Sequence, residues 1–597
     1  MPVLCSIFLL YLLLWGGGYA VYMSCNRGLA PNARLQQFLR YMVGALVAVL
    51  PLAVMWCSPW QPALLLSLGV SASWMVSYPL LYHLTNRKVS PDYDNQIDIS
   101  FGIYLFGWLS SLFLLLPVAG YGWGVLLFLL FMPMVVLWVY YITCHVVLDE
   151  SGMKMLQETD YNEVIEFLHS YSAWRILTTA LAVLLLAAGC IYTAGSFRPV
   201  FAEPAWWQQV IVGGLLVFST IYMWKPSHGL FVRCGLSRLY QVVKEYVENN
   251  SHYISNREQR MTHLDVETPR PLNTPHTIIM VIGESASRDY MSAFVTLNED
   301  TTPWMRCLSE DKAHCVLFPH AYSCDIQTVP TLEKVLTEYN QYDGGQFYTS
   351  CSVVDIAEKA GYHIHWYSNQ GHLGAADTPI TLVANSAHVA KWTEQVLNKT
   401  QYDESLIDFL SEVDPKEKNF VVLHLMGSHF NYENRFTEET RQWGEPGNHD
   451  RILNYKNSLY YTDTVLRHVF EYGREHLNLQ GMVYFSDHGD IPDRHRMPNF
   501  SGFLDTRIPL MVWLGKEYVA LRPDRLAALQ NNSLRYWTND LLYELMCGIF
   551  DIKSNHYRED NSLASDQYRF TLEQLTAMNG RFNISIDAND TRINNKF

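Results

Sequence analysis

The sequence predicts an N-terminal multi-span α-helical membrane domain followed by a soluble α/β domain. Residues 1–225 are dominated by Leu, Val, Trp and Tyr, whereas the rest of the chain is mixed and polar. In this second part, short runs rich in Val and Ile alternate with helical patterns, which is typical of buried parallel strands in an α/β sheet. A chain of 597 residues is also too long for a single core.

Seven stretches in residues 1–225 are apolar over roughly 17–25 residues, the length that crosses a bilayer. We expect spans at about 3–22, 40–57, 63–83, 101–118, 122–143, 175–196 and 207–224. The first run lacks the basic start and the small-residue cleavage site of a signal peptide, so we expect it to stay as a span. Residues 144–174 are polar with apolar side chains near helical spacing, which predicts an amphipathic segment on the membrane surface.

Composition also sets the remaining boundaries. We expect a connecting helix and a polar linker over residues 226–275, with the helix at Leu236–Val247. The soluble domain is predicted over residues 276–552, and residues 553–597 form a polar C-terminal extension rich in Asn, Asp and Arg.

The charge of the chain limits its partners and bears on its orientation. A net charge of −15 argues against nucleic acid, because neutralising phosphates requires a basic surface. Most Lys and Arg residues of the membrane domain fall in loops on the side of the soluble domain, which by the positive-inside rule favours a cytoplasmic soluble domain. Seven spans place the N-terminus and the soluble domain on opposite sides of the membrane.

Five apolar runs are the predicted strands of the soluble domain, and most of them end in polar residues. They are His276–Ile282, Ile364–Tyr367, Phe420–Leu425, Met482–Phe485 and Ile508–Leu514. Glu284, His429, Asp487 and His488 follow three of these runs, and the ligands of such sheets gather at the carboxyl ends of the strands. Carboxylates and imidazoles are zinc ligands, so the sequence predicts a metal-dependent active site. The alternative for Asp487-His488 taken alone is an ordinary polar turn.

A metal of this kind can activate a hydroxyl nucleophile, and the sequence offers two candidates. Ser285 lies beside Glu284. Thr328 precedes Pro330 and the helical pattern Thr331–Tyr339, so we expect it near a helix N-terminus, where amide donors favour an oxyanion or a phosphate. An N-cap threonine without a chemical role is the alternative.

Four of the eleven cysteines could form disulfides. Cys307 and Cys315 flank a short polar loop, and Cys324 and Cys351 flank a predicted helix. Such bonds would indicate an oxidising compartment, and buried free thiols are the alternative. None of the cysteines has the C-x-x-C spacing of a zinc knuckle.

Together, the motifs resemble the phosphoethanolamine transferases of Gram-negative bacteria, which belong to the alkaline phosphatase/sulfatase superfamily. The motifs that carry the resemblance are Val281–Ser285, Ser323-Cys324 with Thr328, Met426–His429 and Ser486–Gly489. The resemblance implies an alkaline phosphatase/sulfatase-like domain whose mostly parallel central sheet has helices on both faces. The family's zinc ligands correspond to Glu284, Thr328, Asp487 and His488.

The resemblance also implies roles for individual residues. Thr328 corresponds to the threonine that accepts phosphoethanolamine from phosphatidylethanolamine. His429 and His495 correspond to histidines that contact the substrate phosphate or a second zinc ion, so we expect them in catalysis and substrate binding. The threonine loop has Asp-Ile-Gln where the lipid A enzymes often have Gly-Thr-Ser, and the loop before His495 is shorter. These departures bear on which acceptor the protein uses more than on the reaction that it catalyses.

A second match lies in the membrane domain. Leu156–Glu163 resembles the family's Glu-Thr-Asn-x-Asn-Glu segment, which lies on the periplasmic face and contacts the lipid head group, and Thr159 and Glu163 are the matching residues. Carboxylates here could meet an ethanolamine ammonium group, and a solvated helix face is the alternative. We follow this match over the charge distribution, because the donor lipid requires access to the membrane.

The resemblance thus implies a multi-pass inner-membrane enzyme with a periplasmic catalytic domain. It would transfer phosphoethanolamine from phosphatidylethanolamine to an envelope glycan or lipid, such as lipid A or the lipopolysaccharide core, through a covalent threonine intermediate. We expect one zinc site, leave a second open, and expect a monomer. The alternatives are another phosphoryl transferase or hydrolase of the superfamily, such as a phosphoglycerol transferase, and a catalytically silent lipid-binding membrane protein. A sulfatase would need a C/S-x-P-x-R motif, and none lies near a predicted strand end.

Overall fold

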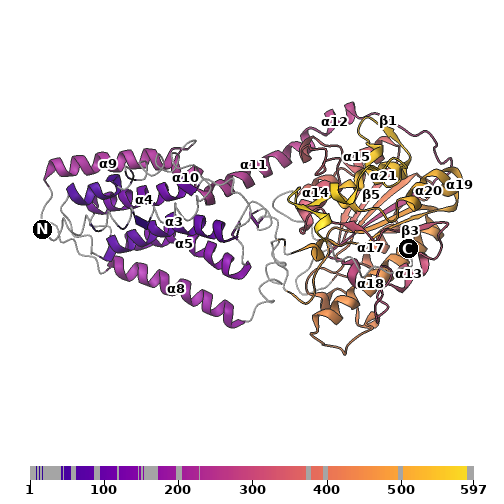
Figure 1. Ribbon diagram of the computed structural model, residues 1–597, viewed down its shortest axis with the longest axis horizontal. Coiled ribbons are helices and arrows are strands. Elements are labelled where there is room, and N and C mark those ends of the chain that lie inside the picture. Colours follow the sequence, from indigo (N-terminus) through magenta and orange to yellow (C-terminus); the bar gives the residue numbers. More distant parts are fainter. Residues whose placement is uncertain are drawn as a thin grey trace. The chain divides into compact units, whose positions relative to one another are not determined.

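The computed structural model describes most of the chain. The described residues are 62–85, 95–116, 120–144, 173–195, 205–226, 229–370, 378–393, 401–494, 500 and 502–587, with short pieces before residue 62 and within 145–172. They separate into two compact units, a helical unit that covers most of the chain up to Glu245 and an α/β unit that begins at Tyr246 (Figure 1).

The helical unit contains five long helices in its described part. They are α3 (Pro62–Thr85), α4 (Asn95–Leu115), α5 (Gly120–Cys144), α8 (Ala173–Gly195) and α9 (Trp206–Trp224). Among the described residues, three stretches are long and apolar enough to cross a membrane, namely Leu64–Thr85, Gln96–Leu115 and Tyr121–Thr143, and α8 adds the shorter apolar stretch Leu177–Tyr192. Residues 46–54 of the span predicted at 40–57 are helical, whereas most of the span predicted at 3–22 and most of the segment 144–174 lie outside the described residues.

Three consecutive helices, one of them long, connect the helical unit to the α/β unit along the chain. They are α10 (Leu230–Arg233), α11 (Gly235–Ser255) and α12 (Arg257–His263). The predicted connecting helix is therefore present as α11, which continues eight residues beyond Val247. The segment expected to be a linker is partly helical, because α12 lies within it.

A seven-stranded sheet forms the centre of the α/β unit, in the order β3-β9-β8-β2-β7-β5-β6. The strands are β2 (Thr277–Gly283), β3 (Cys315–Leu317), β5 (His363–Ser368), β6 (Val389–Trp392), β7 (Asn419–His424), β8 (Leu479–Ser486) and β9 (Leu510–Leu514). The neighbours β8, β2, β7, β5 and β6 are parallel. The predicted mostly parallel sheet is confirmed.

One predicted strand runs in the opposite direction. Ile508–Leu514, expected to be parallel, forms β9, which is antiparallel to β8 and to β3. A parallel neighbour requires a crossover connection, usually a helix. The described residues between β8 and β9 contain only the short helical turn Phe503–Thr506, so the chain returns directly beside β8.

Helices cover both faces of the sheet, as predicted (Figure 1). The side chains of β2 alternate, with Ile278, Met280 and Ile282 in one core and Ile279 and Val281 in the other. The first core includes residues of α14 (Thr328–Val335), α15 (Val353–Lys359), α16 (Pro379–Ala384), α19 (Lys516–Leu521), α20 (Pro523–Asn531) and α21 (Leu542–Phe550). The second includes residues of α13 (Pro303–Leu308), α17 (Ser405–Leu410) and α18 (Arg451–His476).

The C-terminal residues up to 587 pack onto the α/β unit. Strand β11 (Lys553–Ser554) pairs with β1 (Val266–Glu267), β10 (Trp537–Thr538) pairs with β4 (Ala321–Tyr322), and β12 (Thr576–Ala577) pairs with β13 (Phe582–Asn583). Beyond these strands, Ile584 is buried in the first core. The end of this segment is held by an ion pair between Asp587 and Arg507, 2.7 Å apart.

The predicted disulfides are wrong, since all four cysteines named above are free. Cys307 is exposed, whereas Cys315 is buried in strand β3. Cys324 lies before α14, and Cys351 lies beside Glu338, which follows that helix. A helix of eight residues is about 12 Å long, well beyond the Cα separation of a disulfide, about 4.4–6.8 Å.

We predict that Arg507→Ala destabilises the α/β unit by about 3–5 kcal/mol, because it leaves the buried partners of Arg507 uncompensated. The Arg507 guanidinium lies 2.8 Å from Asp289 and 2.7 Å from Asp587, with 3% of its side chain exposed. The control is Arg306→Ala, which removes an exposed pair with Asp300 and should cost no more than about 1 kcal/mol. Pulse proteolysis of the full chain in urea measures both variants, and equal losses would contradict the prediction.

Candidate metal-binding active site

Two neighbouring parallel strands bring three candidate ligands together. Glu284 follows β2 directly, and Asp487 and His488 follow β8. Because Gly283 pairs with Ser486, both strands end at the same edge of the sheet. The three side chains are buried, and each offers a ligand atom within 4.8 Å of the other two. The convergence that the sequence led us to expect is thus present in the structure.

Helix α14 supplies the fourth member of this group. Thr328 is the first residue of α14, and its hydroxyl Oγ1 donates a hydrogen bond of 3.1 Å to Glu284 Oε2. The same oxygen lies 3.4 Å from His488 Nε2. A helix N-terminus favours negative charge nearby, so the hydroxyl oxygen occupies a position suited to a nucleophile or to a bound phosphate.

The orientation of His488 is set by its own backbone. Its Nδ1 lies 2.7 Å from the carbonyl oxygen of Gly489. A carbonyl only accepts hydrogen bonds, so Nδ1 carries the proton and Nε2 presents a lone pair. Nε2 faces the carboxylates, at 3.4 Å from Glu284 Oε1 and 3.3 Å from Asp487 Oδ2. This is the arrangement of a metal-binding histidine that is oriented by a backbone partner.

Backbone conformations that are rare for most residues keep the two carboxylates in place. Ser285 has a positive φ of 56°, and its amide donates a 3.0 Å hydrogen bond to Asp487 Oδ1. Gly427 has a φ of +53°, and a Cβ at this position would lie 2.7 Å from the carbonyl oxygen of Glu284. Strained backbone of this kind is typical of functional sites. Gly427 is therefore required by close approach as well as by conformation.

Ser285, the other nucleophile candidate, is occupied with Glu284. Its hydroxyl donates a 2.6 Å hydrogen bond to Glu284 Oε1. Its geometry is therefore that of a residue that orients the carboxylate.

Gln370, for which the sequence predicted no role, also contacts Glu284. Its side-chain amide donates to Glu284 Oε2 at 3.1 Å and to the carbonyl of Leu425 at 2.9 Å. Its position three residues after the apolar run Ile364–Tyr367 was the available signal, because the end of β5 lies at the same sheet edge as the ends of β2 and β7. Gln370 thereby fixes the second oxygen of the Glu284 carboxylate.

The electrostatics of the site fit a divalent cation. Burial and the neighbouring Glu284 carboxylate raise the pKa of Asp487 well above its usual range. Two buried carboxylates repel each other unless a proton or a cation lies between them. Carboxylate oxygens and an imidazole Nε2 are ligands of tetrahedral zinc, and the Thr328 hydroxyl would complete a set of four. The residues present therefore fit the predicted zinc ion.

Of the remaining predicted site residues, the structure describes only His429. His429 follows β7 at the same sheet edge, and the adjacent Ser428 amide donates a 2.9 Å hydrogen bond to the Glu284 carbonyl. His495, Thr159 and Glu163 lie outside the described residues. Their roles in binding substrate stay predictions.

Comparison with known proteins identifies the domain that carries this site. Residues 276–547 match the family model described as Sulfatase. The match begins just before β2 and ends within α21, so it contains all four residues of the site.

Several relatives of the chain are named phosphoethanolamine transferases. The chain is 26% identical over 426 residues to phosphoethanolamine transferase EptC of Escherichia coli (strain K12), covering 64% of this chain and 72% of the relative. It is 26% identical over 298 residues to the Kdo(2)-lipid A phosphoethanolamine 7''-transferase of Salmonella typhimurium, covering 47% of this chain and 50% of the relative. The predicted family and the class of enzyme are confirmed by these relatives.

A solved structure supports the fold over most of the chain. The integral membrane protein lipooligosaccharide phosphoethanolamine transferase A (EptA) from Neisseria meningitidis aligns with a TM-score of 0.55 and 17% identity. The alignment covers 84% of this chain and 98% of that chain. The predicted fold class, apolar N-terminal helices followed by a sulfatase-like α/β domain, is therefore confirmed.

We predict that Gly427→Ala weakens zinc binding by about 10–100-fold, the usual effect of disturbing the groups that hold a ligand. The added methyl group would displace the backbone of Glu284. Gly447→Ala is the matched control, because Gly447 has a φ of +76° and no atom within 4 Å of an added Cβ. Competition with a chromophoric chelator measures both affinities, and the prediction is wrong if the two variants weaken binding equally.

Proposed function

We propose that this protein transfers phosphoethanolamine from phosphatidylethanolamine to an acceptor of the cell envelope, with Thr328 as the nucleophile. The observation that carries the proposal is the Thr328 hydroxyl, which lies at a helix N-terminus and contacts Glu284 and His488. The names of the relatives support the reaction class, since they are transferases of the same group.

The four side chains that meet at the sheet edge would hold one zinc ion: Glu284, Thr328, Asp487 and His488. When bound, zinc supplies positive charge that stabilises the threonine alkoxide and polarises the phosphoryl group. Asp487 is oriented by the amides of Ser285 and His488, at 3.0 and 2.7 Å from its Oδ1. The protein therefore presents preorganised ligands and a nucleophile in one place, as electrostatic catalysis requires.

The reaction would proceed in two displacements. Thr328 Oγ1 attacks the phosphorus of phosphatidylethanolamine, and its proton leaves along the hydrogen bond to Glu284. The bond from phosphorus to the diacylglycerol oxygen breaks, and that oxygen takes up a proton from His429 or His495. An acceptor hydroxyl then gives its proton to the same histidine and attacks the phosphothreonine ester, and the released Thr328 takes back its proton from Glu284. Two such steps replace one difficult displacement with two easier ones.

The donor and the acceptor place the reaction at the membrane. Phosphatidylethanolamine is a membrane lipid, and the chain has apolar helices of spanning length. Thr159 and Glu163 would contact the ethanolamine head group, and the acceptor would be a glycan or lipid such as lipid A or the lipopolysaccharide core. This chemistry requires the catalytic domain in the periplasm, with the protein in the inner membrane.

We expect the full chain, incubated with phosphatidylethanolamine and zinc, to gain the mass of one phosphoethanolamine on the peptide that contains Thr328. Thr328→Ala should lose the adduct, whereas Thr328→Ser keeps a hydroxyl and should retain it. Ser285→Ala separates the two nucleophile candidates and should also retain the adduct, because Ser285 is hydrogen-bonded to Glu284. Peptide mass spectrometry reads all four proteins, and an adduct on Ser285 or an adduct that survives Thr328→Ala would refute the assignment.

The periplasmic placement can be tested with a native cysteine. Cys307 is free and exposed on the α/β unit, whereas the other described cysteines are buried. We predict that a membrane-impermeant maleimide labels the protein in intact spheroplasts and that Cys307→Ser removes most of this labelling. Labelling at Cys307 only after lysis would place the catalytic domain in the cytoplasm, as the distribution of Lys and Arg favours.

A further inference from the structure

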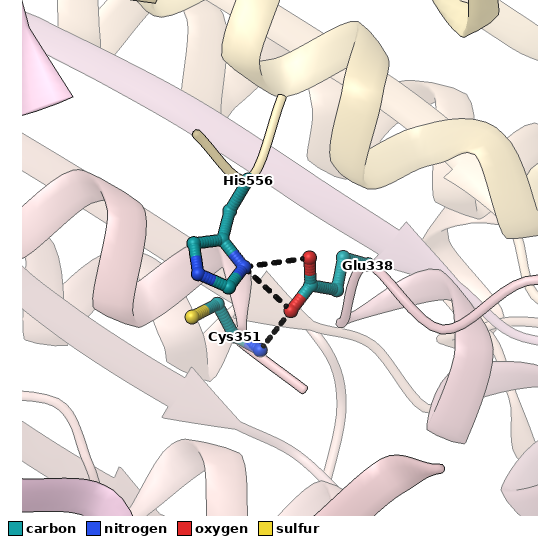
Figure 2. Close-up of side chains that lie close together, drawn as sticks. All are labelled: Glu338, Cys351 and His556. Carbon is teal, nitrogen blue, oxygen red and sulfur yellow. Dashed lines mark hydrogen bonds and ion pairs between the residues drawn. The ribbon is translucent and has the colours of Figure 1, made fainter. Parts of the chain in front are cut away.

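A second group of metal-ligating side chains lies away from the proposed active site. Glu338, Cys351 and His556 each offer a ligand atom within 4.8 Å of the other two. Figure 2 shows the His556 imidazole facing the Glu338 carboxylate, with the Cys351 thiol close to the imidazole. They come from three separate parts of the fold: the segment after α14, the segment before α15 and the turn after β11. None of them belongs to the group of Glu284, Asp487 and His488.

The backbone holds the first two residues in a fixed relation. The Glu338 amide donates a 3.0 Å hydrogen bond to the Cys351 carbonyl, and the Cys351 amide donates a 2.8 Å hydrogen bond to Glu338 Oε1. The neighbouring residues Thr337 and Ser352 form an antiparallel bridge. The carboxylate and the thiol are therefore placed by main-chain pairing, and this pairing also orients the Glu338 carboxylate (Figure 2).

His556 closes the group from the C-terminal part of the chain. Its Nδ1 lies 2.9 and 3.0 Å from the two oxygens of Glu338. Its amide donates to Ser554 Oγ at 3.1 Å, and the next turn is tied by a 2.9 Å hydrogen bond from the Arg558 amide to buried Glu544. The imidazole is thus held at the carboxylate by a structured turn.

The donor set identifies the class of metal. A thiolate, an imidazole and a carboxylate suit zinc, whereas magnesium and calcium require oxygen ligands. Zinc–ligand distances of about 2.0–2.3 Å correspond to spacings between tetrahedral ligands of roughly 3.3–3.8 Å. The three ligand atoms all lie within 4.8 Å of one another, so they exceed these spacings by about 1 Å or slightly more at most.

The charges and the exposure also agree with zinc. The Cys351 thiolate and the Glu338 carboxylate together balance the two positive charges of Zn²⁺. A complex with no net charge suits this place, because Cys351 is buried, at 1% exposure. The side chains of Glu338 and His556 are 23% and 28% exposed, which leaves room for a water molecule as the fourth ligand.

We propose that Glu338, Cys351 and His556 form a zinc-binding site distinct from the proposed catalytic site. The bound ion cross-links the segment after α14 to the start of α15 and to the turn after β11. The site contains the Cys351 thiolate, whereas the group of Glu284, Thr328, Asp487 and His488 contains no sulfur. This difference allows each site to be observed separately and independently of transferase activity.

The test replaces zinc with cobalt in the purified full chain. After removal of metal with a chelator, Co²⁺ is added, and the absorption spectrum and the bound metal are measured. We expect a thiolate-to-cobalt charge-transfer band in the near ultraviolet from the wild-type protein, because only a bound thiolate produces it. Cys351→Ser should lose this band and one bound ion per chain, and zinc added to the cobalt protein should abolish the band.

Three further variants make the result specific. His556→Gln changes a partly exposed ligand and should also lose the band, so the test does not rely on replacing the buried cysteine. Cys307→Ser is the matched control at an exposed cysteine and should keep the band. Asp487→Asn should lose the other ion and keep the band, which separates this site from the catalytic one. The proposal is overturned if the folded wild-type protein shows no band, or if the band survives Cys351→Ser.

Discussion

The proposed active site depends on one electrostatic constraint, the burial of two carboxylates side by side. Glu284 and Asp487 are 1% and 0% exposed at the ends of neighbouring strands. Burial and mutual repulsion both disfavour two negative charges, so the site requires a compensating cation or a proton. The backbone amides, hydroxyls and side-chain amide around them only orient the oxygens. They add no full positive charge, so the repulsion is relieved by a proton on one carboxylate or by a bound divalent cation.

The same constraint explains the unusual backbone around the site. Ser285 adopts a left-handed conformation that aims its amide at Asp487, and the left-handed Gly427 lets the segment after β7 lie against the backbone of Glu284. Such conformations cost about 1–3 kcal/mol for a non-glycine residue and persist only where the surrounding structure requires them. At Ser285 this conformation lets the backbone amide donate a hydrogen bond to Asp487, one of the proposed metal ligands.

The sequence allowed prediction of those features that depend on a short stretch of residues, such as strand ends and helix starts. Apolar runs ending in Gly-Glu-Ser and Ser-Asp-His mark strand ends, and parallel strands bring their ends to one edge. This reasoning located Glu284, Asp487 and His488, and Pro330 placed Thr328 near a helix start. The short strands β3 and β6 were not predicted, because three or four residues carry too little periodicity to distinguish them from a loop.

The features that the sequence did not reveal depend on which segments become neighbours. No crossover helix lies among the described residues between β8 and β9, which accounts for the direction of β9. The role of Gln370 follows from the order of the strands. Cysteine spacing suggested a bond between Cys324 and Cys351, but α14 separates the two. Cys351 instead lies close to His556. His556 is about 200 residues further along the chain, in the segment predicted to be a polar C-terminal extension.

The two groups of ligands differ in a way that fits two different roles. The group at the sheet edge includes the hydroxyl of Thr328 on α14, so one of its four ligands is also the proposed nucleophile. A catalytic zinc site keeps such a position for a nucleophile or a substrate, and its charge changes during the reaction. In the other group, Glu338, Cys351 and His556 balance the charge of zinc and join three segments that are distant in sequence. Since Thr328 opens α14 and Glu338 lies just beyond its end, metal ions would fix both ends of the helix that carries the nucleophile.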